Sequence, residues 1–186
     1  LDLFICRYVI HDPGKSCTTS SGIPDYCGPL EYAPTPDVLL RNRGDGTFED
    51  VTIASGIGAA RGAGLGVVCH DFDDDGWIDV YVANDGSANH LWRNRGDGTF
   101  VERGLVAGVA LNAMGDPEAG MGVVAEDLDG DGALDLFVTH LERESNTFYR
   151  GAGSSFTDAT AGSGLGRASF PYTGFGVAGV DVELDG

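Results

Sequence analysis

The stretch "GLGVVCHDFDDDGWIDVYV", residues 64–82, decides the fold, because most of it returns later in the chain. Its partner, "GMGVVAEDLDGDGALDLFV", occupies residues 120–138, and a third start, "GFGVAGVDVELDG", occupies residues 174–186. In each copy an aspartate follows the second glycine of Gly-x-Gly at the same spacing. Agreement at several independent positions indicates that the chain repeats one supersecondary unit.

A glycine-rich hairpin repeats alongside this stretch. The sequence "RNRGDGTF" occurs at 41–48 and at 93–100, and a decayed copy, "YRGAGSSF", occupies 149–156. Each unit of roughly 50 residues predicts four short strands, with "DVYVAN" alternating as a half-buried strand does. No segment has sustained helical periodicity. Four strands per unit predict an all-β fold made of β-propeller blades.

The repeats also predict how the chain divides into blades. We expect one blade at 1–53, interrupted by an insertion at 11–36, then blades at 54–104 and 105–160, and the start of another at 161–186. That gives about three four-stranded blades, fewer than a propeller needs to close. The sequence therefore predicts an arc of a ring of seven or eight blades, truncated at both ends.

The stretch "DFDDDGWID", residues 71–79, crowds five carboxylic acids into nine positions between the first and second strands of a blade. Carboxylates this close repel one another unless a cation neutralises them. The spacing D-x-D-x-D-G-x-x-D supplies hard oxygen ligands in the number that Ca²⁺ prefers, whereas zinc favours Cys and His. An EF-hand is excluded because position 12 is Val82 rather than glutamate and the flanks are strands.

The expected calcium ligands fall in two complete loops and two partial ones. In the first acidic loop (residues 71–79) they are Asp71, Asp73, Asp75, the carbonyl of Trp77, and Asp79; in the second acidic loop (residues 127–135) they are Asp127, Asp129, Asp131, the carbonyl of Ala133, and Asp135. A third site would begin with Asp181, Glu183 and Asp185, and a fourth would be closed by Asp2, which aligns with Asp79.

Charge restricts the classes of partner. The chain carries 29 acidic and 11 basic residues, a formal net charge of -18. Nucleic acid and anionic membranes both need a basic patch, so we expect neither as a partner. The sequence has no run of about 18 apolar residues, so it predicts no membrane span.

Cysteine spacing indicates an oxidising compartment. Cys17 and Cys27 bracket a short polar loop inside the insertion, which predicts a disulfide and an ordered surface loop. Cys6 and Cys69 lie in apolar strand-like runs, so we expect them to be buried as small apolar residues.

These motifs resemble a known family. The Gly-x-Gly-Val lead, the D-x-D-x-D-G-x-x-D loop and the N-x-G-D-G-T-F hairpin are similar to FG-GAP/VCBS-repeat propellers. The stretches "CGPLEYAPTPDVLLRNRGDGTFEDVT", "ANDGSANHLWRN" and "MGDPEAGMGV" are close to the ASPIC/UnbV group, which includes the cartilage acidic proteins. The resemblance implies a secreted or cell-surface, calcium-stabilised propeller that binds an extracellular protein or glycan, in adhesion or as a scaffold.

Two other functions compete with this interpretation. One is a polysaccharide-active propeller enzyme whose catalytic residues lie in the insertion or outside this segment; the other is a fibre or surface-layer subunit that assembles with its own copies. We expect no enzyme activity and no catalytic residues here, because fold alone does not supply chemistry and His70 and Cys69 point to opposite faces of a strand.

Smaller motifs have simpler explanations. Aromatic residues Trp77, Tyr81, Trp92 and Phe137 are expected to pack between blades, with sugar stacking as the alternative. The Arg-Gly-Asp tripeptides at 43–45 and 95–97 coincide with the repeated hairpin turn, so we expect turns rather than integrin ligands.

Overall fold

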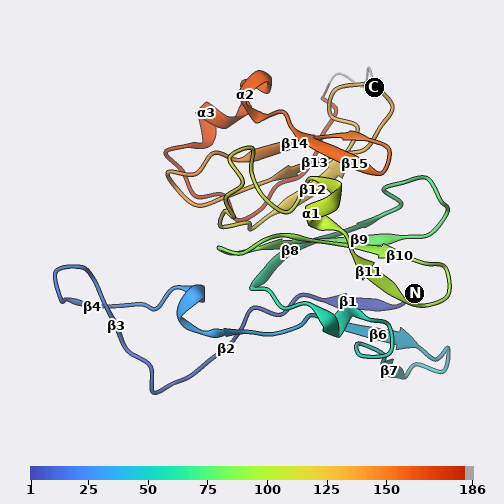
Figure 1. The fold of residues 1–186 in the computed structure, drawn as a ribbon, viewed down its shortest axis with the longest axis horizontal. Helices are drawn as coiled ribbons and strands as arrows, with labels where there is room; N and C mark the ends of the chain where they lie inside the picture. The colour runs from blue at the N-terminus through green and yellow to red at the C-terminus, as the bar shows by residue number, and fades with distance from the viewer. Residues whose placement is uncertain (183–186) are drawn as a thin grey trace.

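The computed structural model describes residues 1–182 as short antiparallel strands joined by loops and a few helical turns. Three sheets lie one above another (Figure 1). The first sheet consists of β1 (Leu3–Ile5), β6 (Val38–Asn42) and β7 (Phe48–Asp50). The second consists of β8 (Gly64–His70), β9 (Asp79–Asn84), β10 (His90–Asn94) and β11 (Phe100–Glu102). The third consists of β12 (Val123–Glu126), β13 (Asp135–Val138), β14 (Thr147–Ala152) and β15 (Ser155–Asp158).

Strands that are consecutive in the sequence pair with one another in these three sheets, except that the insertion separates β1 from its partner β6. The four-stranded sheets run β8 to β11 and β12 to β15 in order, and the three-stranded sheet has the order β1-β6-β7. In the pairing of β8 with β9, His70 lies opposite Asp79, so the first acidic loop joins two paired strand ends. The expectation of an all-β fold with four-stranded antiparallel sheets is confirmed by β8–β11 and β12–β15.

The central strand β9 differs from its prediction. We expected "DVYVAN" to be half-buried, but all six residues are buried. Val80 and Val82 pack on the side of the first sheet, and Tyr81 and Ala83 pack on the side of the third. The expectation was wrong because the middle sheet of a stack has no face turned to water.

The core lies between the sheets. One cluster joins Tyr81 and Leu91 of the second sheet to Leu136 and Tyr149 of the third. Another places Trp92 of the second sheet in a cluster against which Leu39 of the first is packed. Tyr81 and Trp92 are fully buried, so their predicted role in packing is confirmed. Burial of large side chains such as these contributes roughly 1.5–3 kcal/mol each.

The Gly-x-Gly motifs lie where two backbone segments approach each other closely. A Cβ atom at Gly66 would come within 2.2 Å of the Met121 carbonyl oxygen, and one at Gly122 would come within 2.9 Å of the Gly176 Cα. Strand β8 contacts β12 at this point. The repeated glycine is therefore required because any side chain would push two backbones apart.

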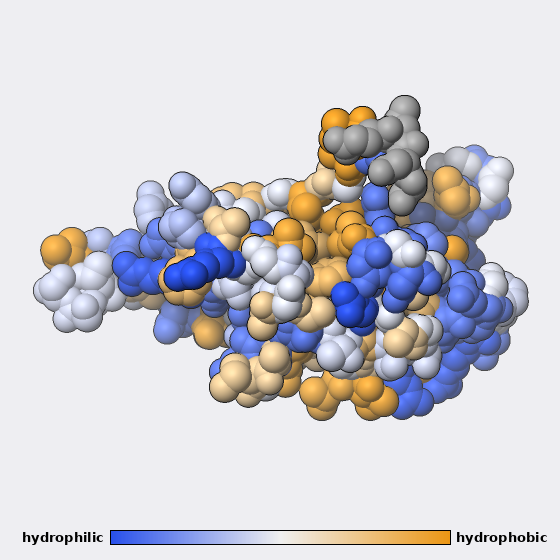
Figure 2. Space-filling view, turned by 90° about the horizontal axis from the view of Figure 1, so that it is seen from above, coloured by the Kyte–Doolittle hydropathy of each residue, from blue (hydrophilic) through white to orange (hydrophobic). Residues whose placement is uncertain are grey.

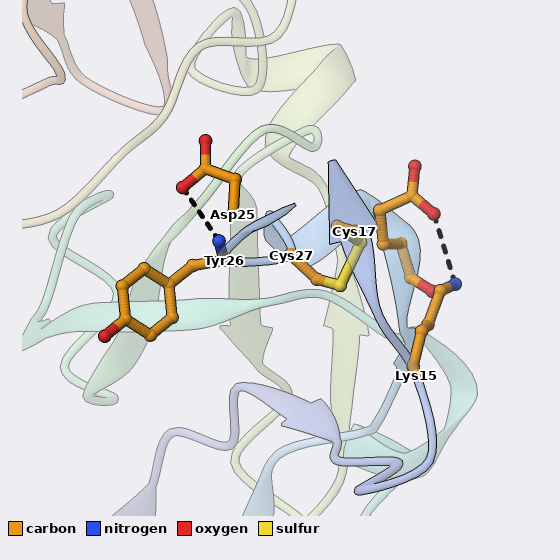
Figure 3. Close-up of a disulfide and its surroundings, with 6 residues drawn as sticks. Lys15, Cys17, Asp25, Tyr26 and Cys27 are labelled. Carbon is orange, nitrogen blue, oxygen red and sulfur yellow. Dashed lines mark hydrogen bonds and ion pairs between the residues drawn. A yellow bond between two sulfur atoms is a disulfide. The ribbon is translucent and has the colours of Figure 1, made fainter. Parts of the chain in front are cut away.

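The insertion forms an ordered arm that extends from one end of the stack (Figure 1). It contains two small ladders, one of β2 (Val9–Ile10) with β5 (Ala33–Pro34) and one of β3 (Cys17–Thr18) with β4 (Pro24–Asp25). The predicted disulfide is confirmed: Cys17 and Cys27 are bonded, with Cα atoms 5.2 Å apart. Figure 3 shows the disulfide beside Lys15, whose ammonium forms an ion pair with Glu31 at 3.2 Å.

Short helical turns occupy the connections, which the sequence pattern did not predict. They are η1 (Pro29–Glu31), η2 (Ile57–Ala59), α1 (Gly104–Ala107), α2 (Thr160–Ser163) and α3 (Leu165–Ser169). Each spans only three to five residues, too short to leave a periodic pattern. None of the helices in residues 1–182 has the length and apolar character needed to cross a membrane.

Exposed apolar residues lie on the side of the third sheet that faces away from the stack. Figure 2, which views the molecule from above the third sheet, shows apolar residues gathered around the middle of this side. Phe175 and Val180, which follow this sheet in the sequence, are 76% and 80% exposed.

Cys6 is partly buried, but Cys69 is exposed, contrary to the expectation that both are buried. Cys69 lies near the end of β8, where the strand leaves the stack for the first acidic loop.

Candidate metal centres

Each acidic loop brings three carboxylates to one point. In the first acidic loop, oxygen atoms of Asp71, Asp73 and Asp79 lie within 4.8 Å of one another. In the second, Asp127, Asp129 and Asp135 form the same arrangement. The two groups occupy equivalent corners of successive sheets, between β8 and β9 and between β12 and β13.

The first aspartate of each loop folds the backbone around itself. The Asp71 carboxylate accepts hydrogen bonds from the amides of Gly76 at 2.7 Å and Asp75 at 3.2 Å. Asp127 accepts equivalent bonds from Gly132 at 2.8 Å and Asp131 at 3.1 Å. The sixth residue, Gly76 or Gly132, has φ of 89° or 90°, which favours glycine. Both loops therefore turn sharply at this glycine.

The last aspartate ties the loop to the sheet. Asp79 Oδ1 accepts a hydrogen bond of 2.8 Å from the amide of Asn94, and Asp135 Oδ1 accepts one of the same length from Gly151. Asp2 makes the equivalent bond with Asn42, also at 2.8 Å. Asp79 and Asp135 are fully buried. In each of the three sheets this position therefore connects one strand to the next strand along the sheet.

An apolar residue at the second loop position anchors the first acidic loop. Phe72 is buried, and its ring packs edge-on against Phe156 of the third sheet with centroids 6.0 Å apart. The Phe72 amide donates to Asp79 Oδ2 at 3.3 Å. Packing between sheets therefore holds the loop that carries the carboxylates.

The negative charge of the clustered carboxylates makes ionisation of Asp73 and Asp135 less favourable. Burial raises the pKa of Asp73, and the negative charges of Asp79, Asp75 and Asp71 raise it further, although Arg93 opposes this. Burial and the nearby Asp129 and Asp131 raise the pKa of Asp135, while amide hydrogen bonds lower it. A divalent cation would relieve this repulsion in both loops.

The donor set fits calcium. Each group offers carboxylate oxygens only, with no cysteine or histidine among the members. Asp73 Oδ1 is buried and accepts no hydrogen bond from any described residue. An unpartnered buried carboxylate oxygen is costly unless a cation or water meets it.

The remaining predicted ligands fall outside these two groups. Asp75 Oδ1 accepts the amide of Trp77 at 2.8 Å, and Asp131 Oδ1 accepts the amide of Ala133 at 2.9 Å. Glu183 and Asp185 lie outside the described residues, and Asp181 lies just before them. Participation of Asp75, Asp131, Asp181, Asp2 and the carbonyls of Trp77 and Ala133 stays a prediction.

Sequence reasoning missed an arginine at the first acidic loop. Arg93 Nη1 lies 2.5 Å from Asp79 Oδ2 and 3.4 Å from Asp73 Oδ2. The equivalent residue in the third sheet, Arg150, reaches Asp129. The signal was present, because the third strand of every repeat carries an arginine: Arg41, Arg93 and Arg150.

The repeated Arg-Gly-Asp tripeptides are turns. Asp45 Oδ1 accepts hydrogen bonds from the amide and hydroxyl of Thr47, and Asp97 accepts the same pair from Thr99. Thr47 and Thr99 lower the pKa of these two carboxyls. One oxygen of each aspartate is therefore engaged in holding its own hairpin.

Trp77 differs from the other aromatic residues. The residue is 51% exposed, and its indole lies against Gly96, where a Cβ atom would come within 2.6 Å of the ring. Trp77 also lines a cavity of about 410 Å³ between the first and second sheets, together with Asp2 and Arg41. Of these four aromatic residues, all of which the structure describes, Trp77 is the one that is more than half exposed.

Comparison with known proteins agrees with this geometry. Residues 71–138, which include both acidic loops, match the FG-GAP-like repeat family. The chain is also similar to cartilage acidic protein 1: it is 29% identical over 116 residues to that of Xenopus tropicalis and 28% identical over 120 residues to that of Homo sapiens. Both alignments cover 62% of this chain and 16% or 17% of the relative, so the chain spans a small part of these proteins. The resemblance inferred from the sequence is confirmed.

Proposed function

We propose that this chain is a segment of an extracellular β-propeller that binds one calcium ion in each acidic loop. The observation that carries the proposal is the convergence of three carboxylates at the same corner of two successive sheets. Calcium would be held in the first acidic loop by Asp71, Asp73 and Asp79, and in the second by Asp127, Asp129 and Asp135. Bound calcium supplies charge neutralisation rather than reaction chemistry.

The protein's own residues explain why such a site would stabilise the fold. The last aspartate of each loop already joins two strands, and Phe72 already joins two sheets. A cation that removes repulsion at this corner therefore stabilises the connection between strands and the contact between sheets together.

The stacked sheets support the blade division proposed from the repeats. Residues 1–53, 54–104 and 105–160 would each form one blade, and 161–186 would begin the next. The exposed apolar side chains that follow the third sheet, such as Phe175, suit a surface against which another sheet packs. A ring of seven or eight such blades is the closed form that we propose.

The surroundings proposed for this module follow from its covalent chemistry and charge. The disulfide favours an oxidising compartment, in agreement with a secreted or cell-surface protein. The net charge of -18 favours cations and basic partners. We infer a role in binding an extracellular protein or glycan, or in scaffolding, and not in catalysis.

Thermal unfolding with and without calcium tests this function. Extracellular calcium modules bind with Kd near 10⁻⁴–10⁻³ M, so about 5 mM calcium would stabilise each site by roughly 1–2 kcal/mol. We expect Tm to fall by several degrees when a chelator replaces calcium, with magnesium restoring much less. Identical melting curves in calcium and chelator would contradict the proposal.

A further inference from the structure

Arg93 places a buried positive charge inside the first acidic loop. Its side chain is 10% exposed, and Nη1 lies between the carboxylates of Asp79 and Asp73, at 2.5 and 3.4 Å. Both aspartates belong to the group of three that would hold calcium. The guanidinium is thus a fixed cation beside the position that a second cation would occupy.

The same guanidinium is held from the other side by the neighbouring sheet. Arg93 Nη2 donates to the backbone carbonyl of Ser154, in the hairpin between β14 and β15, at 3.1 Å. Arg41, the equivalent residue of the first sheet, similarly lies beside Gly98 in the hairpin of the second. Nη1 of Arg93 contacts the carboxylates, and Nη2 contacts the neighbouring sheet. The guanidinium therefore cannot move away from the carboxylates without losing a contact between sheets.

The second acidic loop has a different arrangement. Arg150 contacts Asp129 through Nε, but its side chain is 53% exposed. Its ion pair is therefore screened by water, and its charge acts weakly on the other carboxylates. The two loops have the same motif but differ in how strongly a neighbouring arginine opposes a bound cation.

We propose that Arg93 lowers the calcium affinity of the first acidic loop, so that the second acidic loop binds calcium first. This inference rests on the proposed calcium binding and adds its regulation. A charge fixed within a few ångströms of a divalent ion opposes binding most where water is excluded. Calcium entering the first loop must therefore share Asp79 with Arg93 or displace the guanidinium from it.

The count of acidic residues alone predicts the opposite order. The first acidic loop has five aspartates, including the exposed Asp74, whereas the second has Gly130 at that position and four aspartates in all. More negative charge would make the first loop bind more tightly. The order of binding therefore distinguishes control by Arg93 from control by loop charge.

The first experiment leaves Arg93 unchanged. Calcium is titrated calorimetrically into two variants of the full chain: D71N/D73N, which leaves the second loop intact, and D127N/D129N, which leaves the first intact. We expect the second loop to bind at least about tenfold more tightly than the first. Equal affinities, or a tighter first loop, would overturn the inference.

The second experiment changes the arginine in the D127N/D129N background. We expect R93Q to tighten calcium binding by at least about fivefold, and R93K, which retains the charge, to stay within about threefold of the parent. R95Q is the matched control, because Arg95 is an exposed arginine of the adjacent hairpin and its loss changes the net charge equally. Tightening by R95Q equal to that by R93Q would also overturn the inference.

Failure of the proposed function gives a separate result. If the unmodified chain and both single-loop variants bind no calcium, then calcium binding itself is wrong, and the role of Arg93 is overturned with it. If calcium binds in both loops but R93Q has no effect, only the role of Arg93 is overturned. If R93Q does not fold, the order of affinities in the first experiment still decides.

Discussion

The aspartate that closes each acidic loop combines a structural role with the metal-binding role that we propose. Asp79 is fully buried, accepts the Asn94 amide through one oxygen and contacts Arg93 through the other. Its equivalents Asp135 and Asp2 hold the corresponding amide of the next strand in their sheets. Substitution here would disturb the sheet as well as a metal site, which is why the loop variants proposed above change other aspartates.

At this scale the sequence predicted the acidic loop but not its counter-charge. Spacing selected Asp71, Asp73, Asp75 and Asp79, and the structure brings three of them, Asp71, Asp73 and Asp79, together. Arg93 lies on another strand, and its contact with Asp79 depends on strand pairing. Such a contact follows from the sequence only after the strands have been placed.

A buried carboxylate outside the loops gives a prediction about pH. Asp37 is 4% exposed and accepts the Arg7 amide at 2.9 Å, and burial raises its pKa to about 6. The pKa of Asp37 is higher in the folded protein than in the unfolded one, so ionisation of this carboxyl favours unfolding. The stability that the protonated carboxyl contributes is fully present below the unfolded pKa and is lost as pH rises through about 6. Asp37→Asn should therefore stabilise the protein more at pH 7.5 than at pH 5, by about 1 kcal/mol.

Urea unfolding of D37N and the parent at the two pH values measures this difference directly. All other titrating groups are shared, so their effects cancel in the comparison. An equal gain at both pH values would show that Asp37 does not titrate in this range.

At the scale of elements, periodicity identified the strands but not their surroundings. The repeated motifs placed β8 to β11 within a few residues, because turns and apolar runs are local signals. Burial of β9 on both faces was missed, since it depends on sheets far apart in the sequence. The short helices were missed because three to five residues are too few for a helical period.

The close approach of β8 and β12 predicts the effect of enlarging a glycine. Gly66→Ala would place a Cβ atom 2.2 Å from the Met121 carbonyl oxygen, and neither backbone can move without disturbing its sheet. We expect a loss of about 1–3 kcal/mol in the free energy of unfolding, measured by chemical denaturation.

Gly28→Ala is the matched control. Gly28 has a negative φ of -69°, and a Cβ atom there would meet nothing within 4 Å. Its substitution should leave stability within about 0.5 kcal/mol of the parent. Similar losses in the two variants would mean that sheet contact does not explain the Gly-x-Gly repeat.

At the scale of the whole molecule, the repeat predicts stacking, while the proposed function depends on the two acidic loops. Three sheets share two layers of core, and each acidic loop lies at the junction of strands within its sheet. The net charge of -18 favours the binding of cations. The proposed closed ring and the proposed partner depend on residues beyond a single repeat, so the sequence of these sheets does not determine them.

The most direct test of calcium binding is an anomalous difference map from crystals grown with calcium. We expect one peak among Asp71, Asp73 and Asp79 and another among Asp127, Asp129 and Asp135, each with oxygen atoms at about 2.3–2.6 Å. A map with intact sheets, but with only water between these carboxylates, would contradict calcium binding.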